Sequence, residues 1–159
     1  GDSMSNLLVQ NIKHTNNTQS IAVDTSGNVT ASGTIAVDTI KGNASAGSMT
    51  IVGEGGSNTT NLQQGLTKAW IEFNNTGTVA INDSFNYSGI TDDGTGQMNL
   101  AFTTNMGNAN YSIQTHDTLY GLGWSDTSVT SNYDTRRTNQ SWAYLDISQV
   151  WSNVHGDLA

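Results

Sequence analysis

The sequence predicts an all-β protein in which a repetitive β segment is followed by a β-sandwich. Three features of the chain lead to this fold class. Asn, Thr, Ser and Gly are abundant, and few windows carry the apolar spacing of an amphipathic helix. Short runs of alternating apolar and polar residues are separated by turn residues, as in sandwiches and barrels. The pentapeptide IAVDT occurs twice near the amino terminus, which indicates repeated strand-and-turn units.

Composition indicates an ordered protein with one aromatic-rich region. The 159 residues are 35% hydrophobic and 11% charged, and both values lie below those typical of globular domains. Disordered chains usually combine low hydrophobicity with high charge and few aromatic residues. Here all twelve aromatic residues fall between Trp70 and Trp151. A core of large side chains is therefore expected only after residue 66.

Charge and cysteine content exclude several classes of partner and chemistry. With a net charge of −8 and a pI of 4.3, the chain repels phosphate backbones and anionic membranes, so no nucleic-acid partner is expected. The absence of cysteine excludes disulfides and thiol chemistry. No apolar run reaches the length of a membrane span or a signal-peptide core. Residues 1–3 are expected to be a tag remnant, with Met4 as the natural start.

The repeat has a period of 14 residues. IAVDT fills residues 21–25 and 35–39, and a weaker third copy, SMTI, starts at Ser48. One unit of this size buries almost nothing, so such units bury their apolar edges only by stacking on neighbours. Identical chains side by side would bring equivalent Ile and Val residues to a common axis. We therefore expect a shaft intertwined from several chains, and the alternative is a flexible Gly/Ser/Asn linker.

Seven strands are expected after the repeats. They cover residues 69–73, 77–81, 85–90, 97–103, 111–115, 141–147 and 149–155. Asp93-Gly94 predicts a hairpin, and a plain turn is favoured there over a calcium loop because the later oxygen ligands are missing. One or two helical turns are expected within residues 60–68. The aromatic residues in these strand patterns are expected in the core: Trp70, Phe73, Phe85, Phe102, Trp142 and Trp151.

Several stretches of the chain are similar to one known family. They are, in order, IKHTN from Ile12, IAVDTSGNVT from Ile21, KAWIEFNNTGTVAI from Lys68, DSFN from Asp83, ITDDGTG from Ile90, FTTNM from Phe102 and ANY from Ala109. Over residues 4–111 the chain thereby resembles bacteriophage tail fibre proteins, common in marine phages. It departs from that pattern at Asn75, Asn82 and Gly107, where Gly, Arg and Pro are common.

The resemblance implies a virion protein, a homotrimer whose carboxyl-terminal head contacts a host-surface receptor. On this basis residues 1–19 hold the tag remnant and an attachment segment for other tail or capsid proteins. Residues 20–66 form the repetitive β shaft, and residues 67–159 form the β-sandwich head. The expected receptor is a host surface glycan or an outer-membrane receptor.

Residues 116–140 are the candidate binding segment of the head. They read as a long connection without clear strands, and long loops often carry function. Aromatic faces with a few convergent polar groups suit a sugar, and arginine also pairs bidentately with acidic groups. The alternatives are that the aromatic residues fill the core or a subunit interface and that the arginines form structural salt bridges. The candidate ligand-binding residues are Tyr120, Trp124, Asp126, Tyr133, Asp134, Arg136 and Arg137.

Enzymatic chemistry is not expected. The chain has no nucleophile elbow, phosphate-binding loop or zinc-protease motif, so no catalytic residue, cofactor or metal ligand is assigned. Two alternatives remain open. One histidine per chain, from His14, His116 or His155, would suffice to hold a metal on a trimer axis, and two head aspartates would suffice for polysaccharide cleavage. The function predicted is that of a receptor-binding virion fibre; the alternative is a structural head-fibre, decoration or fibre-anchoring protein without a receptor.

Overall fold

The structure is a computed structural model that describes residues 11–13, 19–42, 49–53, 55–119 and 123–159. By its internal contacts the chain divides into two compact units, Gly1–Lys41 and Gly42–Ala159. The boundary between the units therefore lies inside the predicted shaft. The proposed tag remnant and His14 lie outside the described residues.

The first unit contains one small antiparallel sheet in the order β1-β2-β3. Its strands are β1 (Asn11–Lys13), β2 (Gln19–Val23) and β3 (Val29–Ala31). The turn between β2 and β3 is closed by the Asp24 carboxylate, whose Oδ1 accepts 2.9 Å hydrogen bonds from the amides of Ser26 and Asn28. Gly27 takes a φ of 83° in this turn, a conformation that glycine adopts without strain.

The sequence repeat does not form a structural repeat within one chain. Part of the first IAVDT copy lies in β2, whereas residues 35–39 form no strand. The third copy contributes to β4 (Thr50–Val52), which pairs with β5 (Thr59–Asn61) in the second unit. The expectation of equivalent strands at each copy is therefore wrong for the single chain. The physical reason is that a strand needs a hydrogen-bonded neighbour, and residues 35–39 have none in the described part of this chain.

A single helical turn, α1 (Leu62–Gly65), confirms the short helix expected within residues 60–68. Asn61 caps it, because its Oδ1 accepts a 2.9 Å hydrogen bond from the amide of Gln64. At the other end the buried Lys68 ammonium donates to the carbonyls of Gln63 and Leu66. These bonds join the helical turn to the start of the sandwich.

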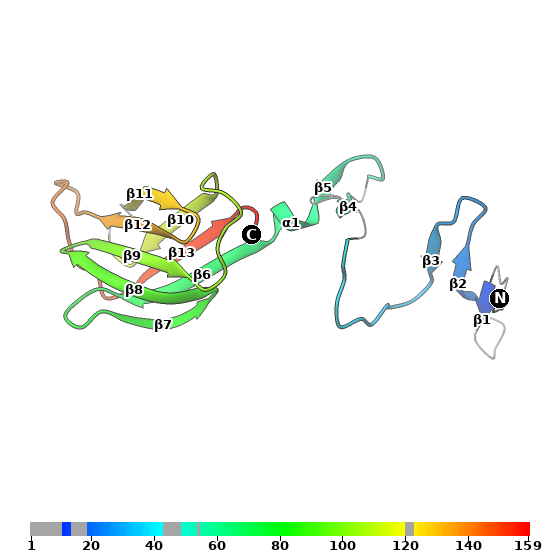
Figure 1. Cartoon of the computed structure of the whole chain (residues 1–159), viewed down its shortest axis with the longest axis horizontal. Coiled ribbons are helices and arrows are strands. Elements are labelled where there is room, and N and C mark those ends of the chain that lie inside the picture. The colour runs from blue at the N-terminus through cyan, green and yellow to red at the C-terminus, as the bar shows by residue number, and fades with distance from the viewer. Residues whose placement is uncertain (1–10, 14–18, 43–48, 54, 120–122) are drawn as a thin grey trace, which may run out of the picture. The chain divides into compact units, whose positions relative to one another are not determined.

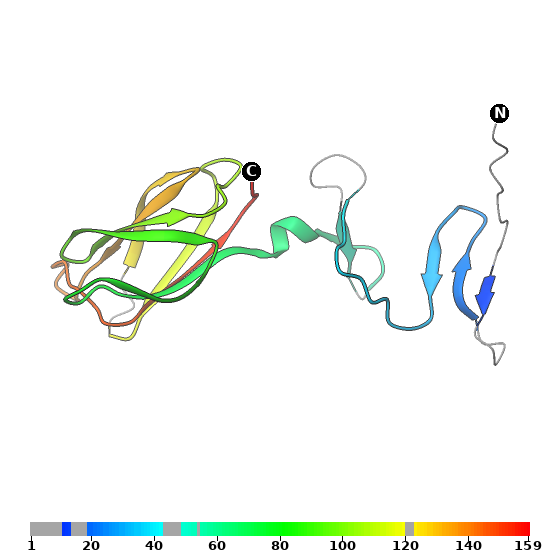
Figure 2. The same ribbon diagram turned by 60° about the horizontal axis from the view of Figure 1, so that its bottom comes forward.

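Residues 67–155 form two four-stranded antiparallel sheets in a sandwich-like arrangement, which confirms the all-β class (Figure 1). Turning the view makes the two layers visible (Figure 2). The first sheet has the order β10 (Ser112–Asp117), β13 (Val150–His155), β6 (Thr67–Asn74), β7 (Ala80–Phe85). The second sheet has the order β11 (Gly123–Val129), β12 (Asn132–Arg137), β9 (Gln97–Phe102), β8 (Tyr87–Gly94).

The core lies between these two sheets. Alternate residues of β6 and β9 point inward, so Ile71, Phe73, Met98 and Leu100 are buried. Tyr87, Phe102, Tyr111 and Tyr133 pack as an aromatic cluster with ring centroids 5.4 to 6.4 Å apart. The hairpin predicted from Asp93-Gly94 is confirmed, since β8 and β9 pair antiparallel, but its turn is formed by Thr95 and Gly96 while Asp93 and Gly94 end β8.

Three expectations about the strands are corrected. The strand expected over residues 77–81 is displaced to β7, and residues 141–147 form no strand. Residues 116–140, expected to be a loop, contain β11 and β12. The alternation was hidden there because Thr135 and Arg137 occupy inward positions that apolar residues usually fill.

The aromatic residues expected in the core divide between the two faces of the sheets. Phe73 and Phe102 are buried as predicted. Trp70 and Phe85 lie on the outer face of the first sheet and are exposed, and Trp151 is half-buried there against His116. Trp142 is exposed in a loop, so its predicted core position is also corrected.

Candidate functional site

The outer face of the second sheet carries most of the residues predicted to bind a ligand. Strand β12 alternates strictly: Tyr133 and Arg137 are buried between the sheets, whereas Asp134 and Arg136 are half-buried on the outer face. Register places Trp124 of β11 beside Arg136, and Asn99 of β9 beside Asp134. Rigid strands therefore present these side chains together.

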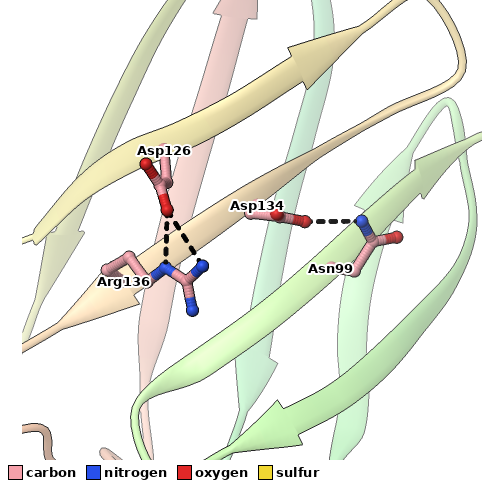
Figure 3. Close-up of polar contacts among 4 residues, drawn as sticks. All are labelled: Asn99, Asp126, Asp134 and Arg136. Atoms are coloured by element: carbon pink, nitrogen blue, oxygen red, sulfur yellow. Dashed lines mark hydrogen bonds and ion pairs between the residues drawn. The ribbon is translucent and has the colours of Figure 1, made fainter.

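An ion pair connects β11 and β12 on this face (Figure 3). Asp126 Oδ2 accepts hydrogen bonds from Arg136 Nη2 at 2.9 Å and from Nε at 3.2 Å. A bulge between Ser125 and Ser128 interrupts the pairing where Asp126 lies. Because the Asp126 side chain is half exposed, this pair contributes at most about 1 kcal/mol to stability. Its main effect is to fix the orientation of both charged groups.

A second polar contact lies next to the ion pair (Figure 3). Asn99 Nδ2 lies 2.6 Å from Asp134 Oδ1 and 3.0 Å from Asn132 Oδ1, and donates to these acceptors. One carboxylate oxygen of Asp134 is used in this way, so the other is available to accept from a ligand hydroxyl. Amide, carboxylate and guanidinium groups thus occupy adjacent strands of one face.

Two exposed tryptophans border these polar groups. The Trp124 and Trp142 ring centroids are 6.4 Å apart with the planes inclined at 54°. Trp124 is 38% exposed and Trp142 is 72% exposed. Such a pair offers apolar ring faces that water covers in the free protein, which is the property required of a stacking surface.

A tight loop holds Trp142 in an unfavourable backbone conformation. Trp142 has a φ of 62°, a region that bulky residues rarely enter. The loop is closed by Asn139, whose Oδ1 accepts from the amides of Ser141 at 2.9 Å and Ala143 at 3.1 Å. The Asn139 carbonyl also accepts from the Trp142 amide at 3.0 Å. The loop therefore fixes the tryptophan, although little of its side chain is buried.

Gly96 anchors this loop to the end of the second sheet. Its carbonyl accepts from the Arg137 amide at 2.8 Å, and its amide donates to Asp146 Oδ1 at 2.6 Å. A Cβ atom on Gly96 would lie 2.6 Å from the Arg137 carbonyl oxygen, and its φ of 66° also favours glycine. The turn between β8 and β9 and the Trp142 loop thus form one hydrogen-bonded assembly.

Four of the seven predicted site residues are brought together on this outer face: Trp124, Asp126, Asp134 and Arg136. Tyr120 lies outside the described residues. Trp142 and Asn99 join the surface but were not predicted. Trp142 was assigned to a strand, and Asn99 is one of many asparagines with no distinguishing signal in the sequence.

The assignment of Tyr133 to a ligand surface is corrected by its burial. Its hydroxyl donates to Ser152 Oγ at 2.6 Å, and this bond links the two sheets. The same hydroxyl lies 2.7 Å from the Tyr87 hydroxyl. Burial raises the pKa of Tyr133 to about 12, and burial beside Tyr133 raises the pKa of Tyr87 well above its ordinary value. Both hydroxyls therefore remain protonated at neutral pH.

Arg137 is corrected in the same way, because its side chain is buried between the sheets. Its Nη1 lies 3.5 Å from Asp117 Oδ2, and Nε and Nη2 have no hydrogen-bond partner among the described residues. Burial lowers the pKa of Arg137 to about 10, which leaves the guanidinium charged at neutral pH. Arg137 thus follows the structural salt-bridge alternative.

Within the described residues no group of three histidine, aspartate or glutamate side chains is placed to hold a metal ion. His116 stacks on Trp151 with ring centroids 5.0 Å apart, and His155 Nε2 lies 3.1 Å from Thr67 Oγ1. In the part of the chain that the structure describes, no helix is long and apolar enough to cross a membrane.

The outer face of the second sheet thus combines apolar ring faces with hydrogen-bonding groups. It offers two indole faces, two carboxylates, an amide and one guanidinium, all held by strands or by a hydrogen-bonded loop. Comparisons of the chain with protein-family models, with curated proteins and with solved structures found no match.

Proposed function

We propose that this chain is a bacteriophage virion fibre protein whose β-sandwich head binds a glycan on the host cell surface. The outer face of the second sheet, around Trp124 and Trp142, would be the binding surface. The observation that carries the proposal is the strained, exposed Trp142. Positive φ at a bulky residue costs free energy, and such strain is found most often at ligand-binding positions.

The chemistry of the face favours a neutral, hydroxyl-rich ligand. Sugar C–H groups would lie on the indole faces of Trp124 and Trp142, while ring hydroxyls donate to the Asp134 carboxylate and to the side-chain carbonyl oxygen of Asn99. An acidic glycan fits less well, because Arg136 already pairs with Asp126 and the whole chain carries a net charge of −8. The preference for neutral sugars therefore follows from the charges on the face.

The first unit supports the fibre part of the proposal. In residues 21–42 no side chain is buried, and six Ile and Val residues are exposed: Ile21, Val23, Val29, Ile35, Val37 and Ile40. A small sheet that leaves this much apolar surface in water is marginal by itself. Packing of equivalent segments in a homotrimer would bury these side chains and provide strand partners for residues 35–39.

The test uses the whole chain on an array of bacterial surface glycans, followed by calorimetric titration of the tightest ligand. Changing Trp142→Ala is expected to weaken binding at least about fivefold, since stacking contributes about 1 kcal/mol or more. Phe85→Ala, an exposed aromatic on the first sheet, is the matched control and should leave the affinity unchanged.

Two results would contradict the glycan proposal. If Phe85→Ala abolished binding while Trp142→Ala did not, the site would lie on the other sheet. If no glycan bound but the chain bound purified virion tail or capsid proteins, the alternative of a structural virion component would replace it. Binding to an outer-membrane protein in place of a glycan would retain the receptor function with a different ligand.

A further inference from the structure

A groove of about 550 Å³ lies between β10 and β11, the edge strands of the two sheets. Its volume is in the range of small-molecule sites. It exists because the inward-facing side chains of β11 are small: Gly123, Ser125 and Ser128 line it and leave the sandwich unfilled at this edge. Tyr111, Ile113 and Trp124 form its apolar part.

Buried hydrogen-bonding groups without partners lie on β12, the strand that pairs with β11, and are not themselves part of the groove lining. Arg137 is in register with Gly123, and its guanidinium packs so closely that a Cβ atom on Gly123 would meet Nη1 at 1.9 Å. Thr135 is in register with Ser125, and its Oγ1 is buried. Arg137 Nε, Arg137 Nη2 and Thr135 Oγ1 have no hydrogen-bond partner within the described ranges of the chain. Native proteins rarely leave buried polar groups unsatisfied.

The buried polar groups of Arg137 and Thr135 that lack partners favour an acceptor oxygen at the floor of the groove. Arg137 supplies buried N–H donors, and the Ser125 and Ser128 hydroxyls lie 3.4 Å apart, longer than a strong O–H···O bond. In a region of low dielectric, donors of this kind create a positive potential that attracts an oxygen acceptor.

The acceptor is expected to be neutral. The Arg137 charge is already opposed by the Asp117 carboxylate, and the chain as a whole carries a net charge of −8. A carboxylate entering the groove would add a negative charge to a balanced pair, whereas a carbonyl oxygen would not. The apolar lining from Ile113, Tyr111 and Trp124 calls in addition for a methyl group.

We propose that the groove between β10 and β11 takes the acetamido group of an N-acetylated hexosamine. Its carbonyl oxygen accepts from the Ser125 and Ser128 hydroxyls, in the positive potential of the buried Arg137 side chain on the neighbouring strand, and its methyl group packs against Ile113 and Trp124. Trp124 belongs both to this groove and to the exposed tryptophan pair, so one sugar reaches both surfaces. This inference rests on the proposed glycan function and names the sugar class that the same head would select.

The experiment measures affinities of the whole chain for six methyl glycosides by NMR, following the tryptophan indole N–H signals. Two parent sugars, glucose and galactose, are each compared with their 2-acetamido derivative and with their uronic acid. We expect the acetamido sugars to bind about tenfold more tightly than their parents, and the uronic acids to bind no better than the parents.

Two variants locate the preference in the groove. Ser125→Val replaces the half-buried hydroxyl by a methyl group and adds a second methyl, on an edge strand that tolerates β-branched residues, and should reduce the preference to less than about twofold. Thr91→Val likewise replaces a hydroxyl by a methyl group, on the exposed side of β8, and should keep the full preference. Thermal midpoints of both variants establish that each is folded.

Equal affinity for acetamido and parent sugars would overturn this inference and leave the proposed glycan function intact. Tighter binding of the uronic acids would overturn it in favour of an anion site. Loss of the preference in Thr91→Val but not in Ser125→Val would place the selectivity elsewhere. If none of the six sugars bound, the acetamido site would be rejected, and the glycan array would decide separately whether the head binds another sugar.

Discussion

Arg137 is the residue whose observed position differs most from the position predicted from the sequence. In the sequence it adjoins Arg136 and was assigned the same ligand-binding role, yet Arg136 is half-buried on the outer face and Arg137 is fully buried. The side-chain alternation of β12 separates the two. The buried guanidinium lies under Gly123 and 3.5 Å from Asp117, so β10, β11 and β12 are coupled through one side chain.

This packing predicts the effect of Gly123→Ala. The new methyl group would lie 1.9 Å from Nη1 and 2.5 Å from Cζ of Arg137, whose buried side chain would have to move from its position beside Asp117. We expect a loss of about 1–3 kcal/mol in the free energy of unfolding, measured by urea denaturation. Gly89→Ala is the control, because nothing lies within 4 Å of its Cβ position, and it should change stability by less than about 0.5 kcal/mol. Equal effects would contradict the buried position of Arg137.

The two buried tyrosines predict loss of stability at alkaline pH. Burial raises the pKa of Tyr133 to about 12 and that of Tyr87 further, against an ordinary value of 10 in the unfolded chain. Above pH 10 the unfolded tyrosines release protons that the folded ones retain, so stability is present below pH 10 and falls as pH rises. Arg137 acts in the opposite direction, because burial lowers its pKa to about 10. Two tyrosines outweigh one arginine, so the free energy of unfolding should fall by about 1 kcal/mol per pH unit between pH 10 and 12.

The measurement is urea denaturation at a series of pH values from 8 to 12. Tyr87→Phe keeps the ring in the aromatic cluster and removes one ionising group, so its stability should depend less on pH. A wild-type stability that stayed constant up to pH 12 would contradict the assigned burial of these hydroxyls.

Among the elements, the loop over residues 138–146 decides how the candidate surface is presented. Its local alternation of aromatic and polar residues predicts a strand, but long-range bonds prevent one. Gly96 is hydrogen-bonded to both Arg137 and Asp146, and Asn139 closes the turn. In place of the predicted strand the loop forms an isolated bridge between Thr138 and Tyr144. Trp142 is thereby turned outward.

The strain in this loop predicts that Trp142→Gly stabilises the fold while abolishing the stacking surface. Glycine adopts a φ of 62° without penalty, and little buried area is lost because Trp142 is 72% exposed. We expect a gain of about 0.5–1 kcal/mol in the free energy of unfolding together with loss of glycan affinity. Calorimetric melting and titration of the same preparation check both. A decrease in stability would mean that contacts of the indole outweigh the strain.

At the scale of the whole molecule, the two units differ in how much of their apolar side-chain surface is buried. The second unit has a core between two sheets, whereas the described side chains of the first unit are all at least partly exposed. One unit is therefore expected to fold by itself, and the other to depend on additional copies of the chain.

This difference predicts the result of deleting residues 1–41. The intact chain should have the mass of a trimer in light scattering, about three times 16.9 kDa. The shortened chain should have the mass of a monomer. The thermal midpoint of the sandwich should be unchanged, because its buried core lies wholly within residues 69–154. An intact chain that is monomeric would contradict the shared shaft, and a shortened chain that remained trimeric would place the interface in the second unit.

The sequence by itself determined the features that depend on local chemistry. The all-β class, the Asp93-Gly94 hairpin, the short helix capped by Asn61 and the burial of Phe73 and Phe102 all follow from residue periodicity or from turn and cap preferences. Trp124, Asp126, Asp134 and Arg136 were singled out by the sequence as candidate ligand-binding residues of a loop, but the structure places them on the adjoining strands β11 and β12.

Only the tertiary structure decided which side chains face outward where polar residues occupy both sides of a strand. Tyr133 and Arg137 are buried because the first sheet supplies a polar partner for each of them. Ser152 of β13 pairs with Tyr133 and Asp117 of β10 pairs with Arg137, and neither partner is a neighbour in sequence. Trp142 is exposed because Gly96 and Asp146 hold its loop against the sheet end. Asn99 joins the surface through strand register alone. Non-local hydrogen bonds fix these positions, and residue patterns do not encode such bonds.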